Sequence, residues 1–269
     1  MRSPSGGRFL VIEGVSKRFE APGRVFEALR DLTLELRHGE FFCLLGPSGC
    51  GKTTVLNMLA GFEPISSGGI HLEAAPITGP HRDRGVVFQS DDALFGWLTA
   101  LENVEFGLKM QGVDRRTRRE TASRFIGLVG LRGHESKFPH ELSGGMRQRI
   151  QIARVLANDP KIVLMDEPFA SLDAQTRRRM QAELVRIWAA AHKTILFITH
   201  DLDESIILAD RIGIMTAGPS ARLREIIEVG LPRPRTRTDP GFVDCYRRCG
   251  AVIEDEVTTS LQEREGSAR

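Results

Sequence analysis

Short and nearly continuous apolar runs recur along the chain and predict the strands of a parallel sheet. They cover residues 40–45, 84–88, 161–166 and 194–199. Strands that are covered by helices on both faces have no polar side, so such runs are typical of parallel sheets. Residues 8–15 and 31–37 instead alternate apolar with polar positions, and with 70–77 they predict a separate antiparallel sheet. The pattern favours an α/β fold.

Helical spacing of apolar residues fills most of the remaining chain. It dominates between Gln89 and Asn158 and returns over residues 173–192, where Met180, Leu184 and Ile187 form a stripe that we interpret as core packing. Arg177-Arg178-Arg179 is interpreted as a solvated face of that helix. After Gly230 a Pro/Arg-containing connector leads to scattered apolar positions, which predict a short helix packed on the core.

A glycine-rich segment lies between the apolar run 40–45 and a helical pattern that begins at Val55. Its residues are Gly46, Pro47, Ser48, Gly49, Cys50, Gly51, Lys52, Thr53 and Thr54. The spacing is that of a P-loop, with a strand before it and a helix after it. Backbone N–H groups would wrap the phosphates, Lys52 would reach the outer phosphates, and the Thr53 hydroxyl would bind Mg²⁺. The chain is predicted to bind a nucleoside triphosphate.

A second phosphate-binding device follows in the stretch Leu-Ser-Gly-Gly-Met-Arg-Gln-Arg over residues 142–149. Ser143 is a good helix N-cap, and Gly144 and Gly145 leave the first N–H groups open to close approach. The unpaired N–H groups and the positive end of a helix dipole both favour an anion. Two phosphate sites but one P-loop lysine predict a two-fold dimer, in which the second site of one subunit caps the nucleotide of the other.

Further motif residues occur in the order shown by one family of ATPases. They are Phe19, Gln89, Asp166, Glu167, Ser171-Leu172-Asp173 and His200. Together with the P-loop and the 142–149 stretch, they make residues 8–230 resemble the ATP-binding-cassette (ABC) ATPases. The resemblance implies an α/β P-loop NTPase core of RecA-like type, an antiparallel β subdomain, an inserted helical subdomain at about 90–158, and a C-terminal tail at 231–269.

The resemblance also assigns roles to these residues, with ATP and Mg²⁺ as the ligands. Phe19 would stack on adenine, and Thr53, Gln89 and Asp166 would hold the metal. Ser143, Gly144, Gly145, Gln148 and Asp173 would contact nucleotide. Glu167, His200 and Gln89 would be catalytic. If the strand at 161–166 continues, Glu167 points opposite to Asp166 and can face the γ-phosphate, where it would orient or deprotonate the attacking water.

Composition gives no argument for a ligand besides ATP and Mg²⁺. Of 269 residues, 37 are Lys or Arg and 35 are Asp or Glu, so the net charge of +2 gives no global argument for nucleic acid. No apolar run approaches the roughly 20 residues that cross a bilayer, and the polar start lacks the apolar core of a signal peptide. The chain by itself is therefore expected to be soluble and cytosolic, and the ABC resemblance implies a peripheral subunit on the cytoplasmic side of the inner membrane.

The four cysteines are too scattered for a disulfide framework. Cys245 and Cys249 share one face of the tail, but no His or third Cys lies nearby, so we expect no metal there. For Cys50 two interpretations stay open. A phosphate-binding loop is electropositive and can make a thiol reactive, or Cys50 is simply a small residue that fits the loop.

Three classes of ABC protein compete for the role. A transporter subunit would recruit separate permease chains. A DNA-repair ABC protein would carry a long coiled coil between Lys52 and Ser143, and a translation factor would carry a second P-loop; the sequence has neither. Residues 84–89, 97–104, 165–173 and 198–205 resemble nitrate/sulfonate/taurine-type importers, which implies a homodimer or paired ATPase, permease subunits and, indirectly, a solute-binding protein. The importer reading is favoured, and the solute is not readable here.

Two departures from that subfamily stand out. Phe95-Gly96 replaces the Leu-Pro that usually precedes the tryptophan, in the segment that lines the groove for the permease's coupling helix. Met146 stands where many relatives carry Gln, so the sequence gives no support for a side-chain contact to nucleotide at that position. Neither departure touches the residues assigned to hydrolysis.

Overall fold

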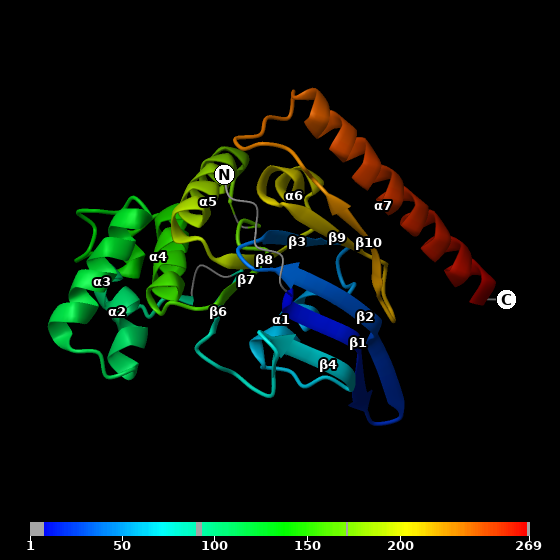
Figure 1. The fold of residues 1–269 in the computed structure, drawn as a ribbon, viewed down its shortest axis with the longest axis horizontal. Helices are drawn as coiled ribbons and strands as arrows, with labels where there is room; N and C mark the ends of the chain where they lie inside the picture. The colour runs from blue at the N-terminus through cyan, green and yellow to red at the C-terminus, as the bar shows by residue number, and fades with distance from the viewer. Residues whose placement is uncertain (1–7, 90–92, 171, 268–269) are drawn as a thin grey trace. The chain divides into compact units, whose positions relative to one another are not determined.

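The computed structural model of the protein describes residues 8–89, 93–170 and 172–267 (Figure 1). The chain divides into two compact units. The terminal unit comprises Met1–Pro80 and Thr194–Arg269, and the central unit is His81–Lys193. Both ends of the chain therefore contribute to one unit, and the other is inserted between them in sequence.

An antiparallel sheet opens the terminal unit in the order β2-β1-β4-β5. Its strands are β1 (Arg8–Ala21), β2 (Arg24–Arg37), β4 (Ser67–Leu72) and β5 (Ala75–Pro76). The hairpin is longer than the predicted 8–15 and 31–37. The predicted strand at 70–77 is interrupted because Glu73 and Ala74 adopt left-handed φ values of 48° and 67° and form a turn.

Strand β3 (Phe41–Leu45) lies between two parallel neighbours in the same unit. They are β8 (Thr194–Thr199) and β9 (Arg211–Met215), and β10 (Leu223–Glu228) runs antiparallel to β9. Every residue of β3 is buried, as its apolar run predicted, and the Phe41 and Phe197 ring centroids are 5.9 Å apart. Strands β3 and β8 were predicted from the sequence, whereas β9 and β10 were not.

Three helices complete the terminal unit: α1 (Lys52–Ala60), α6 (Leu202–Leu208) and α7 (Pro240–Ser267). Helix α7 packs on α6 and β9. Figure 1 shows it in orange and red, leading to the C-terminus. Phe242, Cys245 and Cys249 are the buried residues of α7 within 240–256, where its side chains are described. The expectation of a short tail helix was wrong, since α7 has 28 residues.

The central unit pairs β6 (Arg84–Val87) with β7 (Ile162–Asp166) in parallel. Its helices are α2 (Ala100–Met110), α3 (Arg115–Leu128), α4 (Gly144–Ala157) and α5 (Ala174–Ala191), with a 3₁₀ turn η2 (Pro139–Glu141) before α4. Helices α2, α3 and α4 pack against one another, which agrees with the helical pattern predicted between Gln89 and Asn158. None of the helices that the structure describes is long and apolar enough to span a membrane.

Most of the residues predicted to be buried or solvated on helix α5 are found so in the structure. Met180, Leu184 and Ile187 are buried, as the core stripe required. Arg178 and Arg179 are exposed. Arg177 differs, because it is half-buried and its guanidinium donates to the Leu172 carbonyl at 3.0 Å. One arginine of the predicted solvated face therefore holds the turn before its own helix.

Candidate functional site

The P-loop leads from β3 into α1 in the terminal unit, as predicted. Gly51 is the N-cap of α1 with φ 90°, a conformation that side chains with a Cβ rarely adopt. A Cβ there would also come within 2.9 Å of Leu29 Cδ2. No side chain caps the helix, so its first N–H groups face outward without the usual Ser or Asp partner. An uncapped helix start of this kind is suited to a phosphate.

Lys52 is a buried cation beside that helix start. Lys52 is only 5 % exposed. Its Nζ donates to the carbonyls of Gly46 at 2.8 Å and Pro47 at 3.0 Å. Within the described part of the chain Nζ contacts no carboxylate. A buried charge without a counter-ion is costly. The arrangement therefore fits an anionic ligand, which would supply the missing charge.

Cys50 lies inside the loop but is only 1 % exposed, with its N–H directed at the Pro47 carbonyl at 3.3 Å. Reactive cysteines are accessible to their reagents, whereas this thiol is covered by the loop around it. Of the two interpretations, burial favours Cys50 as a small residue that fits the loop.

Phe19 is on β1, opposite Phe26 of β2, and its residue is 38 % exposed. Lys17 Nζ lies 4.7 Å from the centroid of the Phe19 ring. Lys17 itself is held by Glu63 at 2.5 Å and by the Pro64 carbonyl at 2.8 Å. No local sequence pattern indicates a role for Lys17, because its partners Glu63 and Pro64 lie more than forty positions away. Lys17 therefore makes a cation–π contact with the Phe19 ring from a fixed position.

His200 follows β8 directly, in an exposed position on a turn. Its neighbours anchor the turn: Thr199 Oγ1 donates to Glu204 Oε2 at 2.6 Å, and Asp201 Oδ1 accepts the Glu204 N–H at 3.1 Å to cap α6. Thr199 and Glu204 are buried. The strand end thus presents His200 from a fixed backbone, as its position in the sequence predicted.

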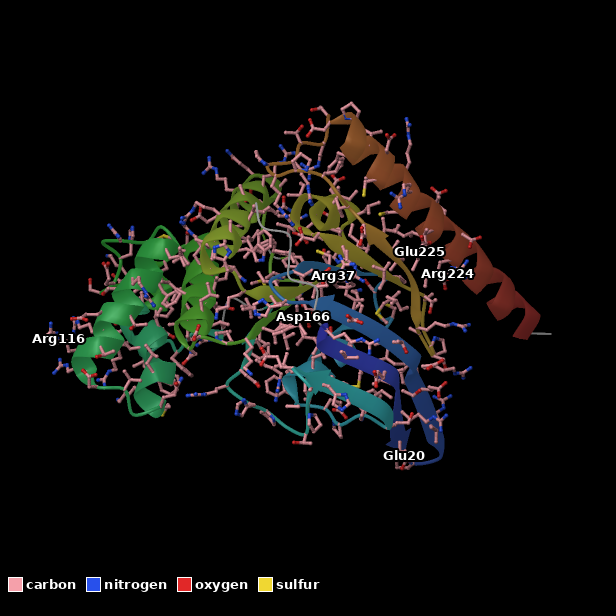
Figure 2. The ribbon with its side chains drawn as sticks, in the orientation of Figure 1. Glu20, Arg37, Arg116, Asp166, Arg224 and Glu225 are labelled. Carbon is pink, nitrogen blue, oxygen red and sulfur yellow. The ribbon has the colours of Figure 1, made fainter. Side chains whose placement is uncertain are left out.

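Asp166 is the last residue of β7 in the central unit and is labelled in Figure 2. Glu167 does not continue the strand, because its φ is 41°. The premise that the two side chains alternate across a continuing strand is therefore wrong: the chain turns at Glu167, and the Ala170 N–H bonds the Glu167 carbonyl at 3.1 Å. A left-handed conformation in a residue other than Gly or Asn costs energy and is concentrated at functional sites.

The 142–149 stretch forms the start of α4. Ser143 is its N-cap and accepts the Met146 N–H at 3.4 Å, and Gly144 and Gly145 are the first helical residues, as predicted. Gln148 is only 1 % exposed, and its amide nitrogen has no hydrogen-bond partner among the described residues. Of these predicted nucleotide contacts, Gln148 is therefore buried, whereas Ser143 is exposed.

Asp173 caps α5. One carboxylate oxygen accepts the N–H groups of Gln175 and Thr176, both at 3.0 Å. The hydrogen bonds from Thr176, through side chain and backbone, lower the pKa of Asp173 and keep it ionised. Ser171, the first residue of the same motif, lies outside the described residues. The structure thus gives Asp173 a local role that its motif did not predict.

The residues proposed for Mg²⁺ are oxygen donors, which suits a hard cation. Thr53 is exposed in the first turn of α1, and Gln89 is exposed two residues after β6. No cluster of three or more His, Cys, Asp or Glu side chains that could hold a metal occurs among the residues described. In nucleotide sites Mg²⁺ is held by a few protein oxygens together with phosphates and water.

The predicted site residues thus fall into two sets, one in each compact unit. Phe19, residues 46–54 and His200 belong to the terminal unit, and Gln89, Asp166, Glu167, Ser143, Gly144, Gly145, Gln148 and Asp173 to the central unit. Apart from Phe19, which lies within β1, most of these residues lie at strand ends or helix starts. These positions expose backbone N–H groups and short polar side chains, which are the groups that bind phosphate.

Comparison with known proteins gives a consistent result. A family model described as "ABC transporter" matches residues 29–170. An uncharacterized ABC transporter ATP-binding protein of Methanocaldococcus jannaschii is 47 % identical over 253 residues, or 94 % of each chain. In Synechococcus elongatus, a nitrate import ATP-binding protein is 43 % identical over 94 % of this chain and 89 % of its own. A bicarbonate transport ATP-binding protein there is 42 % identical over 90 % and 89 %.

Solved structures agree. A dimeric ATP-binding cassette in a post-hydrolysis state, bound to ADP and phosphate, superposes with a TM-score of 0.68 at 27 % identity, over 81 % of this chain and 98 % of that one. The cbiO1 subunit of Clostridium perfringens, part of an ABC transporter complex, gives 0.74 at 27 % identity over 82 % and 88 %. The predicted fold class is confirmed.

Proposed function

Since the chain belongs to the ABC transporter ATP-binding family, we propose that it hydrolyses ATP to energise an importer whose permease is formed by other chains. The ATPase activity follows from the family. The structural observation that supports nucleotide binding is Lys52, a buried cation at an uncapped helix start that contacts no carboxylate among the described residues. Such a site is complete only when an anion such as the triphosphate of ATP is bound.

We propose the following roles for the residues of the chain. The N–H groups at the start of α1 and the Lys52 ammonium bind the phosphates, and Phe19 stacks on the base. Thr53, Gln89 and Asp166 hold Mg²⁺, which supplies charge neutralisation when bound. Glu167 takes a proton from the attacking water while the oxygen of that water bonds to the γ-phosphorus and the bond between the γ-phosphorus and ADP breaks. His200 donates to the γ-phosphate and positions the water.

We further propose that two copies act together. Ser143, Gly144 and Gly145 of one subunit would complete the site that Lys52 opens in the other. The similar cassettes of known structure are dimeric, and one of them holds ADP and phosphate. ATP then binds the closed dimer far better than the open one, and hydrolysis removes that preference.

Two of the relatives are ATP-binding proteins named for nitrate import and for bicarbonate transport. We propose that this chain serves uptake of a small oxyanion or sulfonate-like solute, as a peripheral subunit on the cytoplasmic side of the membrane. The similar cbiO1 protein is part of a transporter complex, which supports permease partners. The competing role, a soluble ABC ATPase of DNA repair or translation, has no support among these relatives.

Glu167→Gln tests the catalytic assignment. The amide cannot take a proton from water but keeps the size of the side chain, so ATP should bind without turnover. We expect size-exclusion chromatography in ATP and Mg²⁺ to show a dimer that is absent without nucleotide. The matched control is Lys52→Ala combined with Glu167→Gln, which should stay monomeric. A Glu167→Gln protein that hydrolyses ATP and elutes only as a monomer contradicts the assignment.

The importer assignment is tested in cells whose own copy is replaced by Lys52→Ala. Uptake of labelled nitrate, bicarbonate and an alkanesulfonate is measured side by side. We expect uptake of one of these anions to fall to background while the others are unchanged. Normal uptake of all three contradicts the proposed solute class but leaves the ATPase assignment intact.

A further inference from the structure

The loop between β9 and β10, residues 216–222, is attached to strand β2 on one side. The Ser220 N–H bonds the Glu27 carbonyl at 2.8 Å, and the Ala221 N–H bonds the Ala28 carbonyl at 3.1 Å. Inside the loop, Thr216 Oγ1 accepts the Arg222 N–H at 3.0 Å and closes it into a hairpin. The loop is therefore an ordered element and not a loose connection.

Helix α7 holds the same loop from a second side. The Ala217 N–H donates to Glu256 Oε1 at 3.1 Å, across 39 positions of sequence. One residue earlier on the helix, Asp255 pairs with Arg224 of β10 at 2.7 Å, and Figure 2 labels Arg224 on that strand. Two consecutive carboxylates of α7 thus bind two different parts of the hairpin, the loop and the strand.

The P-loop touches the third side of this loop. A Cβ on Gly218 would lie 3.1 Å from the Gly49 carbonyl oxygen and 3.7 Å from Cys50 Cα. A side chain at this position would press on the P-loop backbone, which would have to shift by a few tenths of an ångström to receive it. Gly218 follows Ala217 directly, so the residue that Glu256 holds is adjacent to the residue that packs on the P-loop.

We propose that Glu256 is a positioning residue for the P-loop, acting through Ala217 and Gly218. Its carboxylate fixes the Ala217 N–H, and Gly218 then keeps the Gly49–Cys50 backbone in the conformation that receives phosphate. A hydrogen bond to an ionised acceptor is among the stronger ones, so one contact can hold a loop. The C-terminal helix thereby sets nucleotide affinity. This inference rests on the proposed function only for its effect on nucleotide binding, because the effect on the loop itself is independent of it.

Three variants test the proposal in the full chain. Glu256→Ala removes the acceptor, whereas Glu256→Gln keeps an amide oxygen that can accept the same N–H. Asp255→Ala is the matched control, since it breaks the Arg224 pair one residue away on α7. We expect Glu256→Ala to raise the KM for ATP and the Kd for ADP about fivefold, with kcat within about twofold of the original. Glu256→Gln should restore both constants, and Asp255→Ala should leave them unchanged.

Hydrogen exchange without nucleotide gives a readout that does not need ATPase activity. Amides of residues 49–52 should exchange faster in Glu256→Ala than in the original chain or in Asp255→Ala, at equal thermal midpoints. Gly218→Ala should produce the same faster exchange from the loop side. Equal exchange in Glu256→Ala and the original overturns the inference, as does a Glu256→Gln variant that behaves like Glu256→Ala. Absent nucleotide binding in the original chain instead contradicts the proposed function.

Discussion

Charges in the terminal unit are paired closely at the residues that support the P-loop. Glu27 accepts from Ser220 Oγ at 2.8 Å and from Arg18 Nε at 2.9 Å, and it pairs with Arg30. These bonds, with Ser220 the largest cause, lower the pKa of Glu27 to about 2. The carboxylate therefore joins β1, β2 and the β9–β10 loop while it is ionised.

The pH dependence of stability tests this carboxylate. Its pKa is lower in the folded chain than the ordinary 4.5, so its contribution is fully present above about pH 4.5 and is lost as pH falls toward 2. In denaturant unfolding, Glu27→Gln should be less stable than the original by a constant amount from pH 7.5 to about 5. That difference should shrink below about pH 4.5.

Ser220→Ala provides the second arm of the same test. Without the largest of the bonds to Glu27, the pKa of the carboxylate in the folded chain should rise, so the loss of stability should still begin near pH 4.5 but should be smaller and complete at a higher pH. A gap between Glu27→Gln and the original that is unchanged at pH 3 would show that Glu27 contributes nothing through its charge.

Most site residues could be predicted from the sequence because their motifs are contiguous and local. Gly51, Lys52 and Ser143 occupy the helix starts at which the pattern placed them. Glu167 was assigned correctly to a strand end, but its φ of 41° could not be foreseen, since a strand pattern does not reveal where the backbone turns. Lys17 and Glu256 act on partners 46 and 39 positions away, and no local pattern encodes such contacts.

Helix α2 shows how a single element is defined by its first residues. Thr99 Oγ1 accepts the Glu102 N–H at 3.3 Å, and Glu102 Oε2 accepts the Thr99 N–H at 2.8 Å. This capping box satisfies two donors that would otherwise be unpaired at the helix start. It orders the segment that follows Phe95 and Trp97, whose ring centroids are 5.4 Å apart.

Thr99→Ala should destabilise the chain by about 1 kcal/mol, because the cap is lost. The thermal midpoint should fall by about 2–4 °C. Thr99→Ser keeps the hydroxyl and should retain the original midpoint within error. An equal midpoint for Thr99→Ala would mean that tertiary packing, and not the capping box, holds the start of α2.

The strands predicted from apolar runs include two that are buried along their whole length. The parallel strands β3 and β8 are buried throughout, so their apolar runs were legible. Strand β10 was missed because only Ile227 of its residues is buried, which leaves no apolar run. The length of helix α7 was underestimated because, among the α7 side chains that the structure describes, only Phe242, Cys245 and Cys249 are buried, so its apolar pattern is sparse.

At the scale of the molecule, the proposed dimer divides each nucleotide site between two chains. Lys52→Ala and Ser143→Leu should each abolish hydrolysis in pure form, since each damages both sites of its own dimer. In a mixed dimer one site carries both substitutions and the other carries neither. Mixing the two purified variants should therefore restore measurable ATPase activity, and mixing each with itself should not. A mixture as inactive as its components contradicts shared sites.

Strand β3 is flanked by β8 and β9, and both neighbours are encoded about 150 residues after it. At a synthesis rate of about 5–20 residues per second, the ribosome needs on the order of 10 s to deliver them. During that interval the apolar strand that leads into the P-loop has been made but cannot pair. A nascent chain stalled shortly before residue 194 should consequently bind chaperones through β3, and nucleotide binding should arise only late in translation.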